Sequence, residues 1–121
     1  MENFTDLVGK ILINVENIDD EKIVFTLEIG EKYKLFHWQD CCENVYVESI
    51  VGDLSDLIGS PILVAEEATN SDPQPGQEVP KYDSFTWTFY KLATRKGYVD
   101  IRWYGTSNGY YSESVSFEKA N

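Results

Sequence analysis

The sequence has little cysteine, few basic residues and no long apolar run, and each shortage excludes a class of protein. Its two cysteines, Cys41 and Cys42, are adjacent, so no disulfide framework joins distant segments. Neighbouring Cα atoms lie about 3.8 Å apart, closer than in an ordinary disulfide, and the pair is predicted to be two reduced thiols. No apolar run approaches the roughly 18 residues of a membrane-spanning helix, and the N-terminus lacks the basic and apolar regions of a secretory signal. We expect a cytosolic protein without membrane contact.

Charge of one sign dominates the chain. Lysine and arginine number 10, against 21 aspartates and glutamates, and the net charge is −11. A surface of this sign repels phosphate backbones, so direct nucleic-acid binding is not expected. Residues 35–80, which we call the acidic window, hold nine acidic residues and no lysine or arginine. The window is either a means of staying soluble or a surface for a basic partner protein. The candidate partner-binding residues are Asp40, Glu43, Asp53, Asp56, Glu66 and Glu67.

The length and the apolar content indicate one folded domain, residues 1–121, which is mostly β. Two short helices are expected near 4–9 and 53–59, the first capped by Thr5 or Asp6 and the second by Asp53 or Ser55. Residues 70–84 contain three of the four prolines and are predicted to form the longest loop. Runs of β-branched and aromatic residues predict eight strands, near 11–18, 22–29, 32–38, 45–51, 62–68, 85–93, 98–104 and 110–117.

The order of these elements repeats along the chain. The tetrapeptide Asp-Leu-Val-Gly at 6–9 recurs as Asp-Leu-Ile-Gly at 56–59, and residues 22–50 align with 87–115 at a constant offset. We interpret this pattern as an internal duplication, in which each half is a short helix followed by four antiparallel strands.

The alignment makes specific residues equivalent, Trp38 with Trp103 and Glu48 with Glu113. The halves would span 4–53 and 54–118. The fold class predicted is therefore α+β, mostly β, with the antiparallel strands forming a sandwich or a barrel-like sheet, because each strand must bury one face.

The densest polar stretch, residues 37–43, contains the only histidine and both cysteines. One interpretation is a cysteine nucleophile with His37 as its base, and another is a metal site formed by His37, Cys41 or Cys42 and an acid. A zinc site needs about four ligands, and a reactive thiol needs electropositive surroundings that this stretch lacks. A turn with small buried thiols is the favoured interpretation, and no cofactor or metal is expected.

Glu48 and Glu113 each follow the pattern Tyr-x-Glu-x-Ile/Val of a half-buried strand. Paired carboxylates can act as general acid and base, but a structural role in which hydrogen bonds satisfy both is favoured. A two-residue Asn-Gly loop would place Glu113 on the Arg102 side. A three-residue turn with a glycine bulge at 107–109, the favoured choice, would place it opposite Trp103.

Trp87 and Phe89 alternate with residues assigned to the core, so they face the other side of their strand. Either the strand is central and covered on both faces, or the two rings form a binding surface. The covered strand is the favoured interpretation.

Four runs of sequence are familiar together. They are Gln-Asp-Cys-Cys-Glu at 39–43, the segment 52–63 that includes Asp-Leu-Ile-Gly-Ser-Pro-Ile-Leu, Ser-Phe-Thr-Trp-Thr-Phe-Tyr-Lys-Leu at 84–92, and the segment 101–115. With these runs the chain resembles, over nearly its whole length, a family of small proteins carried by bacteriophages and prophages that has no assigned activity. The resemblance implies a protein of the bacterial cytosol and supplies no catalytic residue.

Three functions follow as hypotheses. The first is a non-enzymatic binding protein that acts on a host protein and masks a basic, nucleic-acid-binding surface, as an anti-defence inhibitor would. If the turn at 40–43 and the helix at 53–59 lie on one side, their carboxylates are expected to form a continuous negative field. The second is an enzyme or small-ligand binder that uses His37, Cys41 or Cys42. The third is a structural or assembly role in phage development.

Overall fold

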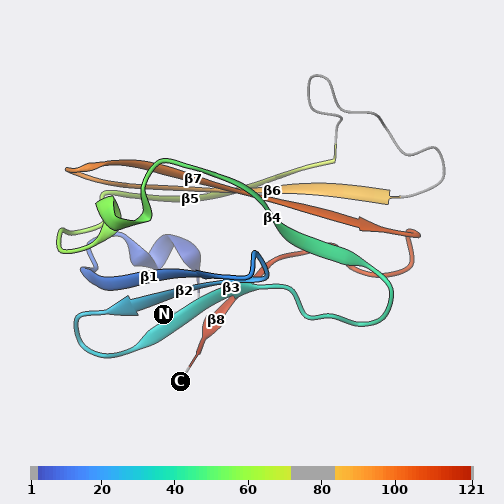
Figure 1. The fold of residues 1–121 in the computed structure, drawn as a ribbon, viewed down its shortest axis with the longest axis horizontal. Helices are drawn as coiled ribbons and strands as arrows, with labels where there is room; N and C mark the ends of the chain where they lie inside the picture. Colours follow the sequence, from blue (N-terminus) through green and yellow to red (C-terminus); the bar gives the residue numbers. More distant parts are fainter. Residues whose placement is uncertain (1–2, 72–83, 121) are drawn as a thin grey trace.

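The fold consists of two four-stranded antiparallel sheets stacked in layers (Figure 1). The computed structural model describes residues 3–71 and 84–120, so the predicted loop at 70–84 lies almost wholly outside the described residues. Sheet 1 has the order β1-β2-β3-β8 and sheet 2 the order β4-β7-β6-β5. The strands are β1 (Leu12–Ile18), β2 (Lys22–Leu27), β3 (Lys32–Phe36), β4 (Asn44–Val51), β5 (Val64–Asn70), β6 (Ser84–Thr94), β7 (Gly97–Ser107) and β8 (Ser116–Lys119).

The chain passes between the layers twice. Sheet 1 takes three consecutive strands from the first half and β8 from the second, whereas sheet 2 takes three consecutive strands from the second half and β4 from the first. Residues 37–43, the first crossover, lead from β3 to β4, and residues 108–115, the second crossover, lead from β7 to β8. In the described part of the chain both sheets keep free edges, so the arrangement is an open sandwich and not a closed barrel. The duplication of the two halves stays a prediction.

The two predicted helices are single 3-10 turns, η1 (Phe4–Leu7) and η2 (Leu54–Leu57). A four-residue segment forms too few hydrogen bonds to offset the entropy cost of nucleating an α-helix, and 3-10 geometry is usual for such short segments. Asn3 precedes η1 as its cap, in place of the predicted Thr5 or Asp6. Asp53, one of the two caps predicted for the second turn, is confirmed, because its carboxylate accepts the Ser55 N–H at 2.9 Å.

The residue pairs that the predicted duplication makes equivalent have different surroundings. Trp38 lies in the first crossover with 64% of its surface exposed, whereas Trp103 is fully buried in β7. Glu48 is exposed in β4, whereas Glu113 is buried in the second crossover. The last strand begins at Ser116 and not near residue 110. The alternation at 111–115 resembles a strand in sequence, but these residues carry the chain from one layer to the other.

The core lies between the layers and is rich in aromatic rings. Trp103, Tyr90 and Phe25 are its largest fully buried side chains. Phe4 packs edge-on against Tyr90, with 4.7 Å between ring centroids, and the ring of Phe117 stacks on Tyr33 at 5.5 Å. Burying a side chain of this size contributes roughly 1.5–3 kcal/mol. No helix among the described residues is long and apolar enough to cross a bilayer.

Trp87 and Phe89 lie on the outer face of sheet 2, away from this core. β6 is a central strand between β5 and β7, and Trp87 is only 6% exposed. The Tyr104 ring lies 4.4 Å from the Trp87 ring, and the Arg102 guanidinium lies over Trp87 at 4.9 Å. The prediction of a covered central strand is therefore confirmed for Trp87, while Phe89 is half-buried.

Gly52, directly after β4, lies where two backbone segments approach closely, so a substitution at this position tests the packing. A Cβ atom at Gly52 would lie 2.3 Å from the Tyr98 carbonyl oxygen, and its φ is +102°. Gly30 has a similar φ of +95° but nothing within 4 Å. We expect Gly52→Ala to destabilise the protein by about 2 kcal/mol or more, and Gly30→Ala by about 1 kcal/mol. Urea unfolding measures both free energies, and equal losses would contradict the close approach.

Candidate functional site

Glu43, in the first crossover, is a buried carboxylate surrounded by donors. Its Oε1 accepts the Cys41 N–H at 2.8 Å, and its Oε2 accepts the Asp40 N–H at 2.9 Å and the His37 Nε2–H at 2.8 Å. Burial on its own would raise the pKa of Glu43, but the hydrogen bonds from Cys41, His37 and Asp40 outweigh it and lower the pKa to about 2. Glu43 is therefore ionised at neutral pH.

His37 is held at both ring nitrogens. Its Nδ1 lies 2.7 Å from the Ser114 carbonyl oxygen, which only accepts, so Nδ1–H donates. Its Nε2 lies 2.8 Å from the Glu43 carboxylate. Both ring nitrogens are thus engaged by acceptors, and only 4% of the His37 side chain is exposed. In this arrangement neither nitrogen is open to a substrate, as the base of an enzyme built on His37 would have to be.

Cys41 and Cys42 form a disulfide between adjacent residues, with their Sγ atoms 2.17 Å apart. The prediction of two reduced, buried thiols is wrong, since the sulfurs are bonded and both residues are exposed. Their Cα atoms lie 3.7 Å apart, closer than the separation usual in disulfides between residues distant in the sequence. Among the described residues no free thiol is present, so the structure offers no cysteine nucleophile.

Glu113 is buried in the second crossover and accepts three hydroxyl groups. The donors are Ser107 at 2.6 Å, Thr86 at 2.7 Å and Ser84 at 3.2 Å, all in sheet 2. Glu48 instead pairs with Arg102 at 2.6 Å on the outer face of that sheet. The two carboxylates therefore lie on opposite faces and do not form an acid–base pair.

The acidic window does not form one surface. Asp40 and Glu43 lie in the first crossover, whereas Asp53 and Asp56 lie at η2, beyond the other end of β4 (Figure 1). A strand as long as β4 (Asn44–Val51) spans about 26 Å. The continuous negative field expected across these residues is therefore wrong. The sequence could not show this, because the strand between the two groups separates them in space.

Glu66 and Glu67 occupy opposite faces of β5. Glu66 lies across from Lys91 on the outer face, and Glu67 lies across from the fully buried Tyr90 on the inner face. Both glutamates are exposed, because β5 is an edge of sheet 2. Of the six candidate residues, these two share one element and one accessible edge.

The four edge strands differ in how well they could accept another strand. β1 has an irregular register between Leu12 and Asn14, and β8 has only four residues. β4 is irregular between Val47 and Ser49, and its Val47 N–H donates to the Asp20 carbonyl at 2.7 Å. β5, in contrast, pairs regularly with β6 over all seven of its residues. β5 is therefore the edge strand with the most regular register in the described part of the chain, and η1 packs beside it.

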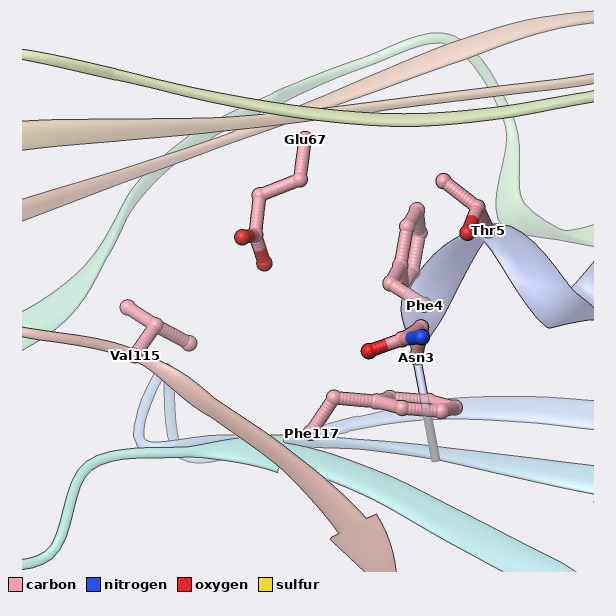
Figure 2. A pocket seen from close by; sticks show the side chains of 6 residues that line it. All are labelled: Asn3, Phe4, Thr5, Glu67, Val115 and Phe117. Carbon is pink, nitrogen blue, oxygen red and sulfur yellow. The ribbon is translucent and has the colours of Figure 1, made fainter. Parts of the chain in front are cut away.

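A cavity of about 430 Å³ opens beside β5, between β5, η1 and β8 (Figure 2). Glu67 extends from β5 into this space, opposite Val115 and Phe117. Sequence analysis singled out Glu67 but missed the cavity, because its walls come from the two ends of the chain. The residues that line it are Asn3, Phe4, Thr5, Glu67, Val115 and Phe117.

A second hollow, of about 470 Å³, lies beside His37. Lys22 and Lys34 line it together with Glu21, so it carries charges of both signs. The Lys34 ammonium lies over the Phe36 ring at 4.3 Å. This mixture selects no class of ligand, and we take β5 and its cavity as the candidate site.

The low pKa of Glu43 makes stability depend on pH in a defined direction. A carboxylate whose folded pKa is about 2, against an ordinary value of 4.5, stabilises the fold fully above pH 4.5 and loses that contribution as the pH falls toward 2. We expect Glu43→Gln to be destabilised relative to wild type at pH 6 and the difference to shrink between about pH 4.5 and 2. Denaturant unfolding at several pH values checks this.

The matched control is Glu16→Gln, which changes an exposed carboxylate on β1. It should follow the wild type across the whole range. A difference between Glu43→Gln and wild type that stays constant from neutral to acid pH would contradict the ionised, hydrogen-bonded Glu43.

Comparison with known proteins places the chain in a family. No curated protein and no solved structure matches it. A family model described as a domain of unknown function, DUF7448, matches residues 5–117. The match begins in η1 and ends in β8, so it includes both crossovers and β5. The chain therefore belongs to the DUF7448 family, an uncharacterised family as the resemblance in sequence implied.

Proposed function

We propose that the protein is a non-enzymatic binding protein whose β5 edge pairs with an extended, basic segment of a partner protein. The observation that carries the proposal is the regular, exposed edge of β5 with a carboxylate on each face. A free edge presents a row of backbone donors and acceptors to an added strand, and alternate side chains of that strand then meet the two faces.

The charge of the edge supports a basic partner. Lys91 lies across from Glu66 on the outer face, while Glu67 has no cation beside it among the described residues. A net charge of −11 also speeds the encounter with a positively charged surface and repels further copies of this acidic chain. The edge is thus suited to a partner of opposite charge.

The resemblance to phage-carried proteins supports a host protein as that partner, with an anti-defence role as the biological setting. The alternatives are less well supported. An enzyme built on His37, Cys41 or Cys42 would need a free ring nitrogen or a thiol, and the described cluster offers neither. An assembly role would use the same edge for pairing between copies of the chain.

The proposal is tested with a model strand, the acetylated peptide Lys-Val-Lys-Val-Lys-Val-Lys amide, and its counterpart with Glu in place of Lys. We expect the basic peptide to bind and to slow hydrogen exchange of the β5 amides. Its affinity should fall as salt rises from about 0.1 to 1 M, because the Debye length falls from about 10 to 3 Å. The acidic peptide should not bind. NMR titration measures affinity and position.

Two double variants with the same charge change locate the contact. The double variant Glu66→Gln with Glu67→Gln should lower the affinity for the basic peptide about ten-fold, since each exposed charge contributes up to about 1 kcal/mol. Asp53→Asn with Asp56→Asn, at η2, should change it less than about two-fold, and asparagine keeps the cap. Equal losses, or protection away from β5, would refute the edge as the contact, and sedimentation of the free protein as a dimer would favour the assembly role.

A further inference from the structure

The cavity beside β5 combines aromatic walls with one carboxylate (Figure 2). Phe4 from η1 and Phe117 from β8 meet edge-to-face, with 5.6 Å between their centroids. Val115 closes the side opposite Phe4, and the Glu67 side chain extends into the space between them. Asn3 and Thr5 add polar groups at the η1 side. The walls of the space therefore combine aromatic rings with polar groups, and one of these groups is a carboxylate.

Glu67 is unusual in its direction. The strand register places it on the inner face of β5, level with Tyr90 of the neighbouring strand. Among residues 3–71 and 84–120 it takes part in none of the ion pairs, and the Tyr90 hydroxyl is close enough to interact with its carboxylate. Edge strands also carry inward-pointing charges simply as a protection against aggregation. The direction of Glu67 alone therefore does not identify a ligand.

Tyr90 supplies the second observation. Its side chain is fully buried, and its hydroxyl meets no hydrogen-bond partner in the described part of the chain. Burial, followed by the charge and the hydrogen-bonding capacity of nearby Glu67, raises the pKa of Tyr90, so the hydroxyl stays protonated and lies close to that carboxylate. Its ring packs against Phe4. The Glu67 carboxylate, which lines the cavity, and the buried Tyr90 hydroxyl thus lie close together.

We infer that this cavity binds an organic cation, the ammonium or guanidinium head of a lysine or arginine side chain that the partner strand inserts beside β5. The inference rests on the proposed function for the source of the cation. Glu67 would pair with the charge, the Phe4 and Phe117 rings would cover the methylene stem, and their π-systems favour a cation over a neutral group. The Tyr90 hydroxyl would then complete the polar surroundings of Glu67.

The cavity is tested first without any partner, using n-butylguanidinium and n-butylammonium as probes and n-butylurea as the neutral analogue. NMR titration of the whole chain should show saturable shifts at Phe4, Glu67 and Phe117 with both cations and none with the urea. Binding of n-butylurea as tight as that of n-butylguanidinium would overturn recognition of the charge.

The neighbouring glutamates provide matched variants. Glu67→Gln removes the inward charge with little change of shape. It should lower the affinity for n-butylguanidinium at least ten-fold, as the loss of a charge-assisted contact does. Glu66→Gln removes the outward charge one residue away and should leave the affinity within about two-fold. Thermal unfolding checks that both variants fold. Equal affinity of Glu67→Gln and wild type would overturn the assignment of Glu67.

Competition identifies the source of the cation. n-Butylguanidinium should displace the side chains of the basic peptide from the cavity and weaken that peptide several-fold. If the small cations bind but do not compete with the peptide, the cavity is a site for free cations, and the partner side chain is refuted as its occupant. If the peptide binds along β5 and the small cations do not bind, the cavity proposal fails while the proposed function stands.

Discussion

Two buried carboxylates hold the points where the chain passes from one sheet to the other. Glu43 gathers the backbone of the first crossover around itself and pairs with His37. The other ring nitrogen of His37 lies 2.7 Å from the carbonyl oxygen of Ser114 in the second crossover, so the His37 ring joins both crossings. Removing one partner of a buried pair leaves an uncompensated charge, and the cost of that charge keeps both residues in place.

The second crossover has its own anchor, and this anchor decides where β8 lies. Glu113 accepts hydroxyl groups from Ser107 and Thr86, both of sheet 2. Gly105 makes room for it, because a Cβ atom there would lie 2.9 Å from the Glu113 Cβ. With the crossover fixed on sheet 2, the chain reaches sheet 1 as a short edge strand in which Phe117 faces Phe4. The cavity beside β5 is therefore a consequence of how the crossing is held.

Sequence reasoning located most strands because a half-buried strand alternates, as in Ile23, Phe25 and Leu27, which are all buried in β2. It failed where an alternating pattern serves another purpose. Residues 111–115 alternate like a strand, yet hydroxyl groups around Glu113 hold them outside any ladder. The local pattern cannot record such partners, because they come from distant strands.

The same limit applies to the candidate site. Composition identified Glu66 and Glu67 as part of the acidic window, but it could not show that alternation points one outward and the other between the sheets. The cavity walls required knowing that β8 joins sheet 1, a fact set by the crossovers and by no local spacing. A stretch of sequence rich in acidic residues thus overestimates the size of the acidic surface, because the strand or turn that carries each residue decides where its side chain lies.

The acidic residues of this protein consequently divide into three physical roles. Glu43 and Glu113 organise the fold from inside, where donors on every side make the charge tolerable. Asp53 caps a turn, and Glu48 pairs with Arg102, so both serve local structure at the surface. Glu67 differs from all of these, since it extends into a cavity lined by aromatic rings and takes part in no ion pair among the described residues. A carboxylate without an ion-pair partner in the described part of the chain is the feature most directly available for a partner.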